Sequence, residues 1–507
     1  MSYSIFDLFK QHAQKFPEKP ALIIGEKSLT YKELLKLTED FVQRLSSLGI
    51  GKQTHVATFL GNNLEMVLLL LSGAKLGFVL IPLPPELPKL FRKNILRTCD
   101  VQVAITTSHL KREISEDIPT FAVEEIYETP PKEIKISEKP NLDTPFIITT
   151  TSGSTGIPKP IVLTQRIKLL RAFEGAKKVF NLSANDIYIV STPLYHSLAQ
   201  RFTLLPLMTG ATAVVMPKFQ VAKWLDFVKK YKVTFGVLVS SQLESIANHL
   251  WENREIENLS SLRKVISSSA PLLDITRKKV LELAKSIGWE VFETYGTSEI
   301  GFATILNLTK ETNKWKSVGK PLPYVKIKIL KERALGSRDI GEIAVKTKTI
   351  FAGYYNMPEK TKQSFDNEGF FLTGDLGYLD SDGYLYFVGR KKEIIITGGI
   401  NVYPQDVERV LLNHPSVKEC AVFGIEAQPF GEIVCALVVP KDKNKFNLSE
   451  LRKYCRQNLT SYQQPLIWKI VDEIPKNHLG KVSRTELKKL ISKEEISNLL
   501  EKIKGLL

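Results

Sequence analysis

One short segment of the chain carries a dense set of groups that suit phosphate. Residues 150–159 read Thr-Thr-Ser-Gly-Ser-Thr-Gly-Ile-Pro-Lys, which places hydroxyls and a lysine around two glycines. Glycine lets backbone N–H groups turn towards an anion, the hydroxyls add donors, and the lysine adds a full positive charge. The segment follows an apolar run and precedes a predicted helix, and no Gly-Lys-Ser/Thr triplet closes it as in a Walker loop. We predict a phosphate-binding loop; the alternative is a flexible serine-glycine linker.

Further motifs follow at long intervals. They are Tyr295-Gly-Thr-Ser-Glu299, Thr373-Gly-Asp375, the run Gly-Arg-Lys-Lys-Glu-Ile-Ile-Ile-Thr-Gly-Gly-Ile-Asn-Val-Tyr-Pro-Gln-Asp-Val-Glu at 389–408, and Asn-His-Leu-Gly-Lys-Val-Ser-Arg at 477–484. In this order and spacing, the loop and these motifs resemble the adenylate-forming superfamily of acyl- and aryl-CoA synthetases, peptide-synthetase adenylation domains and luciferases. The resemblance covers essentially the whole chain, and the 389–408 run is similar to the CoA-ligase form.

The resemblance implies a nucleotide site spread along the sequence. Tyr295 would pack on adenine, Ser298 would reach the α-phosphate, and Asp375 with Arg390 would bind the ribose hydroxyls. An ionised carboxylate with two oxygens suits a vicinal diol. The implied ATP- or AMP-binding residues are Thr151, Ser152, Gly153, Ser154, Thr155, Gly156, Lys159, Ser269, Ala270, Pro271, Thr294, Tyr295, Gly296, Thr297, Ser298, Asp375, Arg390 and Lys481.

Four residues carry the implied catalysis: Lys481, Thr151, Glu299 and His196. Lys481 would bridge the substrate carboxylate and the α-phosphate, while Glu299 and Thr155 would hold Mg²⁺, a hard cation that prefers oxygen ligands. Without the resemblance, Glu299 would be an ordinary surface acid, and Lys481 would be one of 70 basic residues.

The resemblance places the acyl pocket at Tyr195, His196, Ser268 and Ser269. His196 taken alone would be a structural histidine. No aspartate stands in Thr192-Pro-Leu-Tyr-His-Ser197 to bind an amino acid's ammonium group, so we predict a simple carboxylic acid, fatty or related aliphatic. Three departures from the family, Ser267-Ser-Ser269, Pro160 and Tyr324, stand where glycine is common.

The same resemblance assigns the second half-reaction to the C-terminal part. Gly398 and Gly399 would line the path of CoA, although a tight turn explains two glycines equally well, and Lys392 would be a hinge. We predict ATP-dependent formation of an acyl-adenylate with release of pyrophosphate, then transfer to CoA; the cofactors are ATP, Mg²⁺ and CoA. The alternative is a free-standing adenylation enzyme that loads the phosphopantetheine of an acyl carrier protein.

Composition bounds the remaining possibilities. The 507 residues are 43% hydrophobic and 24% charged, as in globular proteins, and 70 basic against 54 acidic residues give a net charge of +16. That charge suits nucleic acid, an anionic membrane or polyanionic substrates; no nucleic-acid motif is present, so we expect ATP and CoA to use it. Four scattered cysteines with no Cys-x-x-Cys, and no His-Glu-x-x-His, indicate no disulfide scaffold or zinc site. We expect a cytoplasmic protein without a transmembrane segment, with peripheral membrane contact left open.

The elements that must position these residues alternate between strands and helices. Apolar runs at 146–148, 187–190, 213–216, 234–239 and 265–266 predict strands, and helices are expected at 165–180, 220–231 and 273–286. Thr30 and Glu33 have capping-box spacing before a helix that should end near Gly49, and 66–84 predicts a buried helix, a turn at Gly77 and a buried strand. Residues 111–140 are interpreted as a polar, loop-rich insertion.

The fold class that follows is α/β. Half-exposed strands at 326–330 and 341–345 and a hairpin turn at Asp380-Ser-Asp-Gly383 indicate a β-rich part at about 320–389. Beyond it, a helix at 404–413, strands at 419–424 and 432–439 and a lysine-rich helical tail form a smaller α+β unit. With the resemblance, we expect an adenylating domain at 1–389 with two helix-covered, mainly parallel sheets and a β-barrel-like subdomain. A mobile C-terminal lid domain would occupy 390–507.

Overall fold

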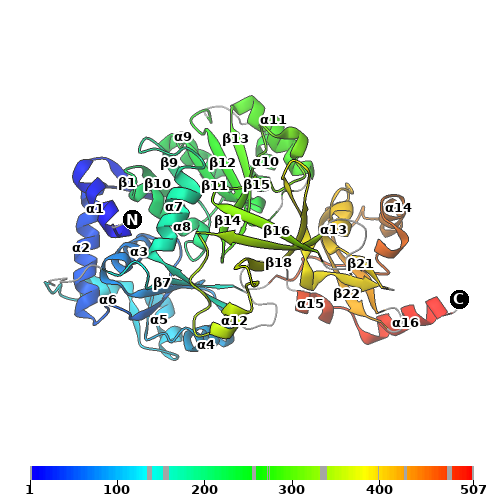
Figure 1. Ribbon diagram of the computed structural model, residues 1–507, viewed down its shortest axis with the longest axis horizontal. Helices are drawn as coiled ribbons and strands as arrows, with labels where there is room; N and C mark the ends of the chain where they lie inside the picture. Colours follow the sequence, from blue (N-terminus) through cyan, green and yellow to red (C-terminus); the bar gives the residue numbers. More distant parts are fainter. Residues whose placement is uncertain are drawn as a thin grey trace.

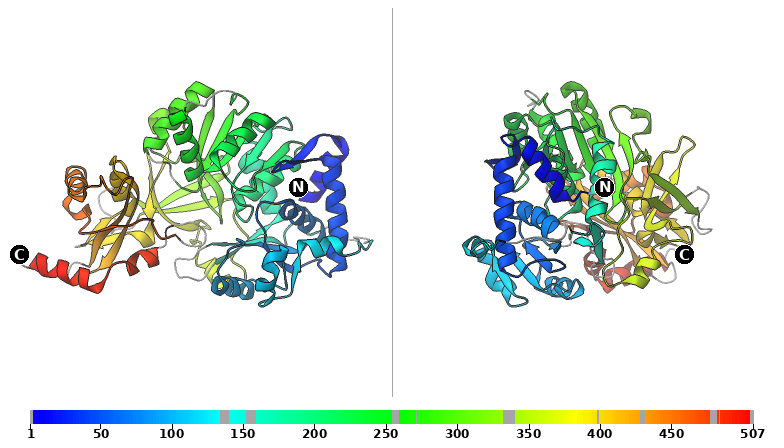
Figure 2. Two further views of the ribbon diagram at one scale, coloured as in Figure 1. Left: turned by 180° about the vertical axis from the view of Figure 1, so that it is seen from behind. Right: turned by 60° about the vertical axis from the view of Figure 1, so that its left-hand side comes forward.

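The computed structural model describes residues 3–133, 140–151, 159–253, 259–270, 272, 274–331, 340–397, 399–427, 431–476, 482 and 484–504. Two large sheets fill the N-terminal part, and the C-terminal elements lie to one side, so that the chain ends are far apart (Figures 1 and 2). None of the helices among the described residues is long and apolar enough to cross a membrane.

The larger sheet has nine strands in the order β15-β14-β13-β12-β11-β9-β10-β1-β2. Its interior pairs are parallel, whereas β2, β14 and β15 run antiparallel at the two edges. The strands are β1 Pro20–Ile24, β2 Lys27–Thr30, β9 Ile187–Val190, β10 Thr212–Val215, β11 Phe235–Val239, β12 Lys264–Ser268, β13 Glu290–Thr297, β14 Gly301–Asn307 and β15 Lys320–Pro321.

The second sheet has six strands in the order β6-β5-β3-β4-β7-β8, all parallel except β8. They are β3 His55–Phe59, β4 Val79–Pro82, β5 Val103–Thr106, β6 Thr120–Ala122, β7 Pro145–Thr151 and β8 Lys159–Thr164. Parallel strands are connected by helices and are buried on both faces, as the apolar runs of the sequence predict.

Helices cover both sheets. They are α1 Ile5–Lys15, α2 Tyr31–Ser47, α3 Leu64–Leu76, α4 Lys89–Thr98, α5 Ser108–Ser115, α6 Val123–Glu128, α7 Gln165–Ala172, α8 Ser197–Leu207, α9 Val221–Tyr231, α10 Ser240–Asn253 and α11 Asp274–Ile287. Figure 1 shows α9, α10 and α11 gathered on the larger sheet and α4, α5 and α6 on the smaller one. The main core joins α3, α7 and α8 to strands of both sheets, through side chains such as Leu69, Leu169, Phe202, Ile147 and Tyr188.

Several local predictions are confirmed. Thr30 and Glu33 form the capping box of α2, and Gly49 follows the helix with a φ of 78°. The apolar run from Met66 gives the buried helix α3, a left-handed turn at Gly77 and the buried strand β4. The helix expected over 165–180 is α7 followed by a π-helical turn, Phe173–Lys177.

The interpretation of residues 111–140 as a loop-rich insertion is wrong for its first part. The structure places α5, the edge strand β6 and α6 within 108–128, and β6 pairs in parallel with β5. Buried Ile114, Val123 and Ile126 hold these short elements to the domain. The density of charged residues hid this apolar spacing in the sequence.

The surroundings of the predicted phosphate loop also differ in one respect. The segment does follow a strand, β7, but a second strand, β8, comes before helix α7, and Thr151 pairs with Lys159 across the β7–β8 hairpin. The β-branched Ile161 and Val162 favour a strand there. Thr151 and Lys159 therefore stand at the two ends of the loop.

The expected β-rich part is a four-stranded antiparallel sheet, β16 Val325–Lys331, β17 Gly341–Thr347, β18 Phe371–Leu379 and β19 Leu385–Arg390, with the short helix α12 Pro358–Lys362. The C-terminal unit contains β20 Ile395–Thr397, β21 Ile400–Val402, α13 Pro404–Leu412, β22 Val417–Glu426, β23 Glu432–Pro440, α14 Leu448–Asn458, β24 Ile467–Ile470, α15 Arg484–Lys489 and α16 Lys493–Lys504. One face of its β22-β23-β24 sheet packs with α13 and α14, and the other packs with α15.

Candidate active site

The order of strands in the larger sheet gathers the predicted site. Strands β9, β11, β12 and β13 are parallel neighbours, so their carboxyl ends meet at one edge. The segment 192–197 follows β9, Ser268 ends β12, and Tyr295 to Glu299 complete β13 and its turn. Open α/β sheets bind ligands outside the carboxyl ends of their strands. This edge brings together residues that the sequence placed in the acyl and nucleotide sites.

The backbone that carries Glu299 is held by a buried arginine. Arg171 of α7 is 2% exposed, and its guanidinium donates to the carbonyls of Ser298 (2.9 Å), Glu299 (2.7 Å) and Thr349 (2.9 Å). Three hydrogen bonds from one rigid planar group leave the backbone little freedom. The turn after β13 is therefore fixed before any ligand binds.

A tyrosine links the carboxylate of Glu299 to the end of the phosphate loop. The Tyr354 hydroxyl donates to Glu299 Oε1 at 3.0 Å, and Lys159 Nζ lies 5.3 Å from the centroid of the Tyr354 ring. Tyr354 forms an isolated bridge with Ile161 of β8, and Phe351 N–H donates to the Glu299 carbonyl. The segment 349–355 thus joins β8 of one sheet to the β13–β14 turn of the other.

The charges around Lys159, Tyr354 and Glu299 favour the binding of an anion. Burial lowers the pKa of Lys159; Lys360 and Lys392 lower it further, whereas Glu299 opposes the shift. Burial also raises the pKa of Tyr354, aided by the Glu299 charge, so Tyr354 remains a hydrogen-bond donor. Because the charge of Lys392 lowers the pKa of Lys159, the predicted hinge residue lies within electrostatic range of the end of the loop.

A second cluster of side chains in the candidate site contains Asp375, Tyr295 and Arg390. Tyr295 OH donates to Asp375 Oδ2 at 2.8 Å, and Arg390 Nε lies 3.3 Å from Asp375 Oδ1. Asp375 pairs with Arg390 in the β18–β19 register, which confirms the hairpin predicted from the turn at residues 380–383. Burial raises the pKa of the Asp375 carboxyl, whereas Arg390 lowers it. The pair offers a buried acceptor next to an exposed cation.

The predicted acyl residues lie around the start of α8 and the end of β12. His196 immediately precedes α8, and the Tyr195 and His196 rings meet edge to face with centroids 4.6 Å apart. Ser268 is partly buried, and Ser269 is exposed with a φ of 84°, a left-handed conformation that favours glycine. Serine therefore stands in a backbone position that explains why glycine is common there.

Some predicted residues cannot be placed. Ser152, Gly153, Ser154, Thr155, Gly156, Pro271, Gly398 and Lys481 lie outside the described residues, as does the side chain of Thr151. Lys392 is exposed in the short 3₁₀ turn Lys391–Glu393, and Gly399 is exposed between β20 and β21 with a φ of 78°. Their assignments to the loop, hinge, CoA path and catalysis stay predictions.

Sequence reasoning missed Arg171 and Tyr354. Arg171 had a signal, because it lies among Leu169 and Ala172 on the buried side of a predicted helix, where a charge requires partners. Tyr354 had none, because its contact with Glu299 spans 55 residues.

The residues present fit a magnesium ion held mainly by its nucleotide. No group of three or more His, Cys, Asp or Glu side chains that could hold a metal occurs in the part of the chain that the structure describes. Mg²⁺ in nucleotide sites is commonly bound by one or two carboxylates together with phosphate oxygens. Glu299, oriented by Tyr354, would supply such a carboxylate.

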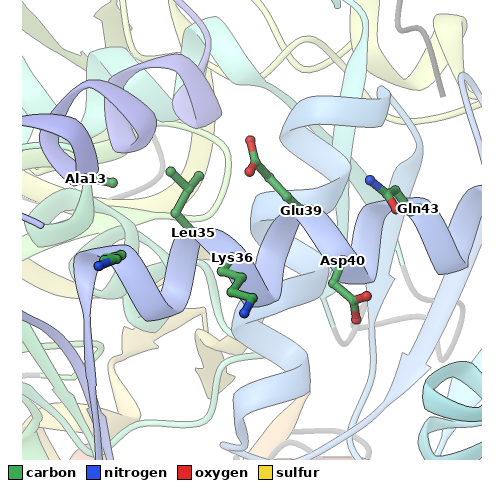
Figure 3. A pocket seen from close by; sticks show the side chains of 7 residues that line it. Ala13, Leu35, Lys36, Glu39, Asp40 and Gln43 are labelled. Carbon is green, nitrogen blue, oxygen red and sulfur yellow. The ribbon is translucent and has the colours of Figure 1, made fainter. Parts of the chain in front are cut away.

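A surface hollow beside α2 is a poorer candidate. Figure 3 shows Leu35, Lys36, Glu39, Asp40 and Gln43 along this helix, with Ala13 of α1 beside them. Its carboxylates are already paired, Glu39 with Lys10 and Lys75 and Asp40 with Arg44. It gathers none of the motif residues.

Comparison with known proteins identifies the family of the chain. Residues 9–355 match the family described as AMP-binding enzyme, and residues 406–481 match the AMP-binding enzyme C-terminal domain. The 2-succinylbenzoate–CoA ligase of Geobacillus kaustophilus (strain HTA426) is 30% identical over 489 residues, which cover 96% of this chain and 98% of that protein.

Two solved structures of o-succinylbenzoate CoA synthetase (MenE) from Bacillus subtilis, each 29% identical, superpose with a TM-score of 0.87. One holds the acyl-adenylate OSB-AMP and covers 95% of this chain and 97% of its own; the other holds ATP and a magnesium ion, with 96% and 99% covered. The chain therefore belongs to the AMP-binding enzyme family, within the adenylate-forming superfamily.

Proposed function

We propose that the protein is an AMP-forming acid–CoA ligase. It joins a carboxylic acid to the α-phosphate of ATP, releases pyrophosphate, and then transfers the acyl group to the thiol of CoA. One observation carries the proposal: one short segment, the end of β13 and the turn after it, runs from Tyr295, hydrogen-bonded to Asp375, to Glu299, which Tyr354 connects to Lys159. ATP would lie along this segment, with adenosine at one end and the phosphates at the other.

The first step needs charge neutralisation more than acid–base chemistry. A carboxylate oxygen attacks the α-phosphorus, and the bond from that phosphorus to the bridging oxygen breaks as pyrophosphate leaves. Mg²⁺ would supply positive charge at the phosphate oxygens. Lys159 stands at the end of the loop, and Arg171 keeps the Glu299 backbone in place. Such preorganised groups stabilise charge with little rearrangement during reaction.

The second step requires a different set of groups at the same carbon. The thiolate of CoA attacks the acyl carbon, and AMP leaves with the pair of electrons from the broken acyl–oxygen bond. We propose that the domain of residues 390–507 turns about Lys392, so that Lys481 serves the first step and Gly398 and Gly399 serve the second. The 3₁₀ turn Lys391–Glu393 directly after β19 is consistent with a hinge at the end of an element.

The acid is the finer part of the proposal. We propose 2-succinylbenzoate as the first acid to test, because relatives that align over nearly the whole chain are named for it. The absence of an aspartate in 192–197 argues against an amino acid, but it does not favour an alkyl chain over a ring. Tyr195 and His196 offer aromatic faces. We place the reaction in the cytoplasm, where ATP and CoA are available.

Pyrophosphate release tests the proposal. Purified protein is given Mg·ATP with 2-succinylbenzoate or octanoate, and with CoA, a holo acyl carrier protein or no thiol acceptor. We expect acid-dependent pyrophosphate release, and a thioester only with CoA. Thioester formation only on the carrier protein would favour the alternative acceptor, and release with octanoate alone would restore the fatty-acid prediction. No acid-dependent release from a broad set of acids would refute adenylation.

A further inference from the structure

A group of buried cations lies beside the candidate acyl site. Lys168, Arg171 and Arg201 are 3%, 2% and 5% exposed, and their positive charges act on one another. Each of the three guanidinium nitrogens of Arg171 donates to a carbonyl, and Lys168 Nζ donates to Gln200 Oε1 at 2.8 Å. Arg201 differs, because its Nε and Nη1 are buried and have no hydrogen-bond partner among the described residues.

An unpartnered buried guanidinium requires an explanation. Burying a charge is costly unless it is paired and hydrogen-bonded, and arginine does not escape the cost by losing its proton. Its neighbours here are cations, so the surroundings increase the cost. Anions that enter the site could offset the free-energy cost of burying the Arg201 charge, and the substrates of the proposed reaction are anions.

Other unpartnered groups lie close to Arg201. Ser197 precedes it by four residues, which places the two side chains on the same face of α8. The Ser197 hydroxyl is also buried, and it has no hydrogen-bond partner in the described part of the chain. The Tyr324 hydroxyl, which interacts electrostatically with Arg201, is a third such group. The guanidinium and the two hydroxyls each have an unused donor, so together they form a site that suits an anionic acceptor.

The position of Arg201 favours the acid over the nucleotide as the source of the anion. Its helix, α8, starts directly after Tyr195 and His196, on the acyl side. Its guanidinium lies 4.4 Å from the ring centroid of Phe302, which follows the Glu299 turn on β14. Arg171, with its donors used by carbonyls, also contacts that turn. The phosphates would lie at Lys159 and Glu299, where other groups already serve them.

We propose that Arg201, supported by Ser197 and Tyr324, binds a second acidic group of the acid substrate, so that the substrate class is acids with two anionic groups. The inference rests on the proposed function and deepens it. The second group would point inward to Arg201, while the reacting carboxylate stays at the edge of the sheet near His196 and Ser269. An aliphatic monoacid would leave Arg201 buried and unpaired.

The first test uses the unmodified protein. Diacids, including 2-succinylbenzoate and the series from malonate to azelate, are compared with their monomethyl esters by kcat/KM for ATP-dependent pyrophosphate release. A site built to bind a charged group rejects the uncharged analogue strongly, so we expect the best diacid to exceed its ester by about 100-fold or more. Equal rates for diacid and ester would overturn the subsite and indicate that buried water or a free inorganic anion satisfies Arg201, while adenylation itself would stand.

Two variants locate the effect. Arg201→Met keeps a long side chain on Phe302 but removes the charge; we expect kcat/KM for the diacid to fall about 100-fold and that for the monoester to change less than about threefold. Lys168→Met is the matched control, because it removes a buried basic side chain that already has a hydrogen-bond partner, Gln200. If kcat/KM for the diacid falls equally in both variants, the preference for diacids comes from the overall charge of the cluster, and the proposed direct contact with Arg201 is wrong.

A binding measurement separates this inference from the proposed function. Calorimetric titration of the diacid without ATP should show binding to the unmodified protein and to Lys168→Met, and at least tenfold weaker binding to Arg201→Met. That result supports the subsite even if pyrophosphate release fails with every acid. Absence of diacid binding together with active turnover of monoacids would overturn the subsite and leave the ligase proposal in place.

Discussion

Removing the Tyr354 hydroxyl isolates the contact that would orient Glu299, the carboxylate proposed to bind Mg²⁺. In Tyr354→Phe the ring remains beneath Lys159, and the 3.0 Å hydrogen bond to Glu299 is lost. Hydrogen bonds to charged groups contribute about 1.5–3 kcal/mol. Glu299 is only partly buried, so water replaces some of this energy, and the lower end is appropriate. At about 1.4 kcal/mol per factor of ten, we expect roughly a tenfold effect.

The assay is ATP–pyrophosphate exchange measured against free Mg²⁺ concentration. The half-saturating Mg²⁺ concentration should rise about tenfold, because a carboxylate that samples more orientations is a poorer ligand. Tyr355→Phe is a matched control: it removes a 3.0 Å tyrosine–aspartate hydrogen bond, to Asp100, one residue further along. If the two variants have the same Mg²⁺ dependence, Tyr354 does not orient Glu299 and the reasoning is wrong.

Three further predictions concern other contacts. Arg171→Met removes the guanidinium donors of three carbonyls, of which the Glu299 carbonyl keeps the Phe351 N–H, so exchange should fall about 100-fold in the same assay. Arg171→Lys should restore only part of it, because an ammonium lacks the planar fork. Asp375→Asn should raise the melting temperature at pH 7.5, because the raised pKa means that the folded state favours the uncharged carboxyl. This advantage should shrink as the pH falls through the raised pKa of the folded protein, and it should vanish below about 3.9, where the wild-type carboxyl is protonated in both states. The same variant should bind ATP about tenfold more weakly by titration calorimetry. Lys481→Ala should lose acid-dependent exchange yet form thioester from supplied acyl-adenylate; equal loss of both would argue against alternation of the C-terminal domain.

Local patterns predicted the elements where the relevant contacts are close in sequence. The Thr30–Glu33 capping box spans three residues, and the Gly77 turn separates a buried helix from a buried strand. The prediction of secondary structure failed where charged residues surround a few apolar ones, as at Ile114, Val123 and Ile126. These elements are stabilised by packing on the sheet rather than by their own propensity, and the sequence of a segment does not state what it will pack against.

The contacts of the candidate site also fall into those that the sequence predicts and those that it does not. Asp375 and Arg390 were predictable as partners because a tight turn at residues 380–383 fixes which strands pair. The contacts of Arg171 with residues 298, 299 and 349 span more than 100 residues, and that of Tyr354 with Glu299 spans 55. Motifs therefore predicted groups that would contact the ligand, whereas the groups that orient them became visible only with the three-dimensional arrangement.

The hydrogen-bond partners of the two buried arginines distinguish a side chain with a structural role from one that could bind a ligand. Arg171 and Arg201 are both almost fully buried and lie in the same cluster, so neither burial nor charge separates them. Arg171 donates to three carbonyls, and those bonds fix the turn that carries Glu299. Arg201 has two buried donor atoms without partners among the described residues. Since protein interiors rarely leave a buried donor unsatisfied, the first arginine has completed its role when the chain folds, and the second completes it only when an anion arrives.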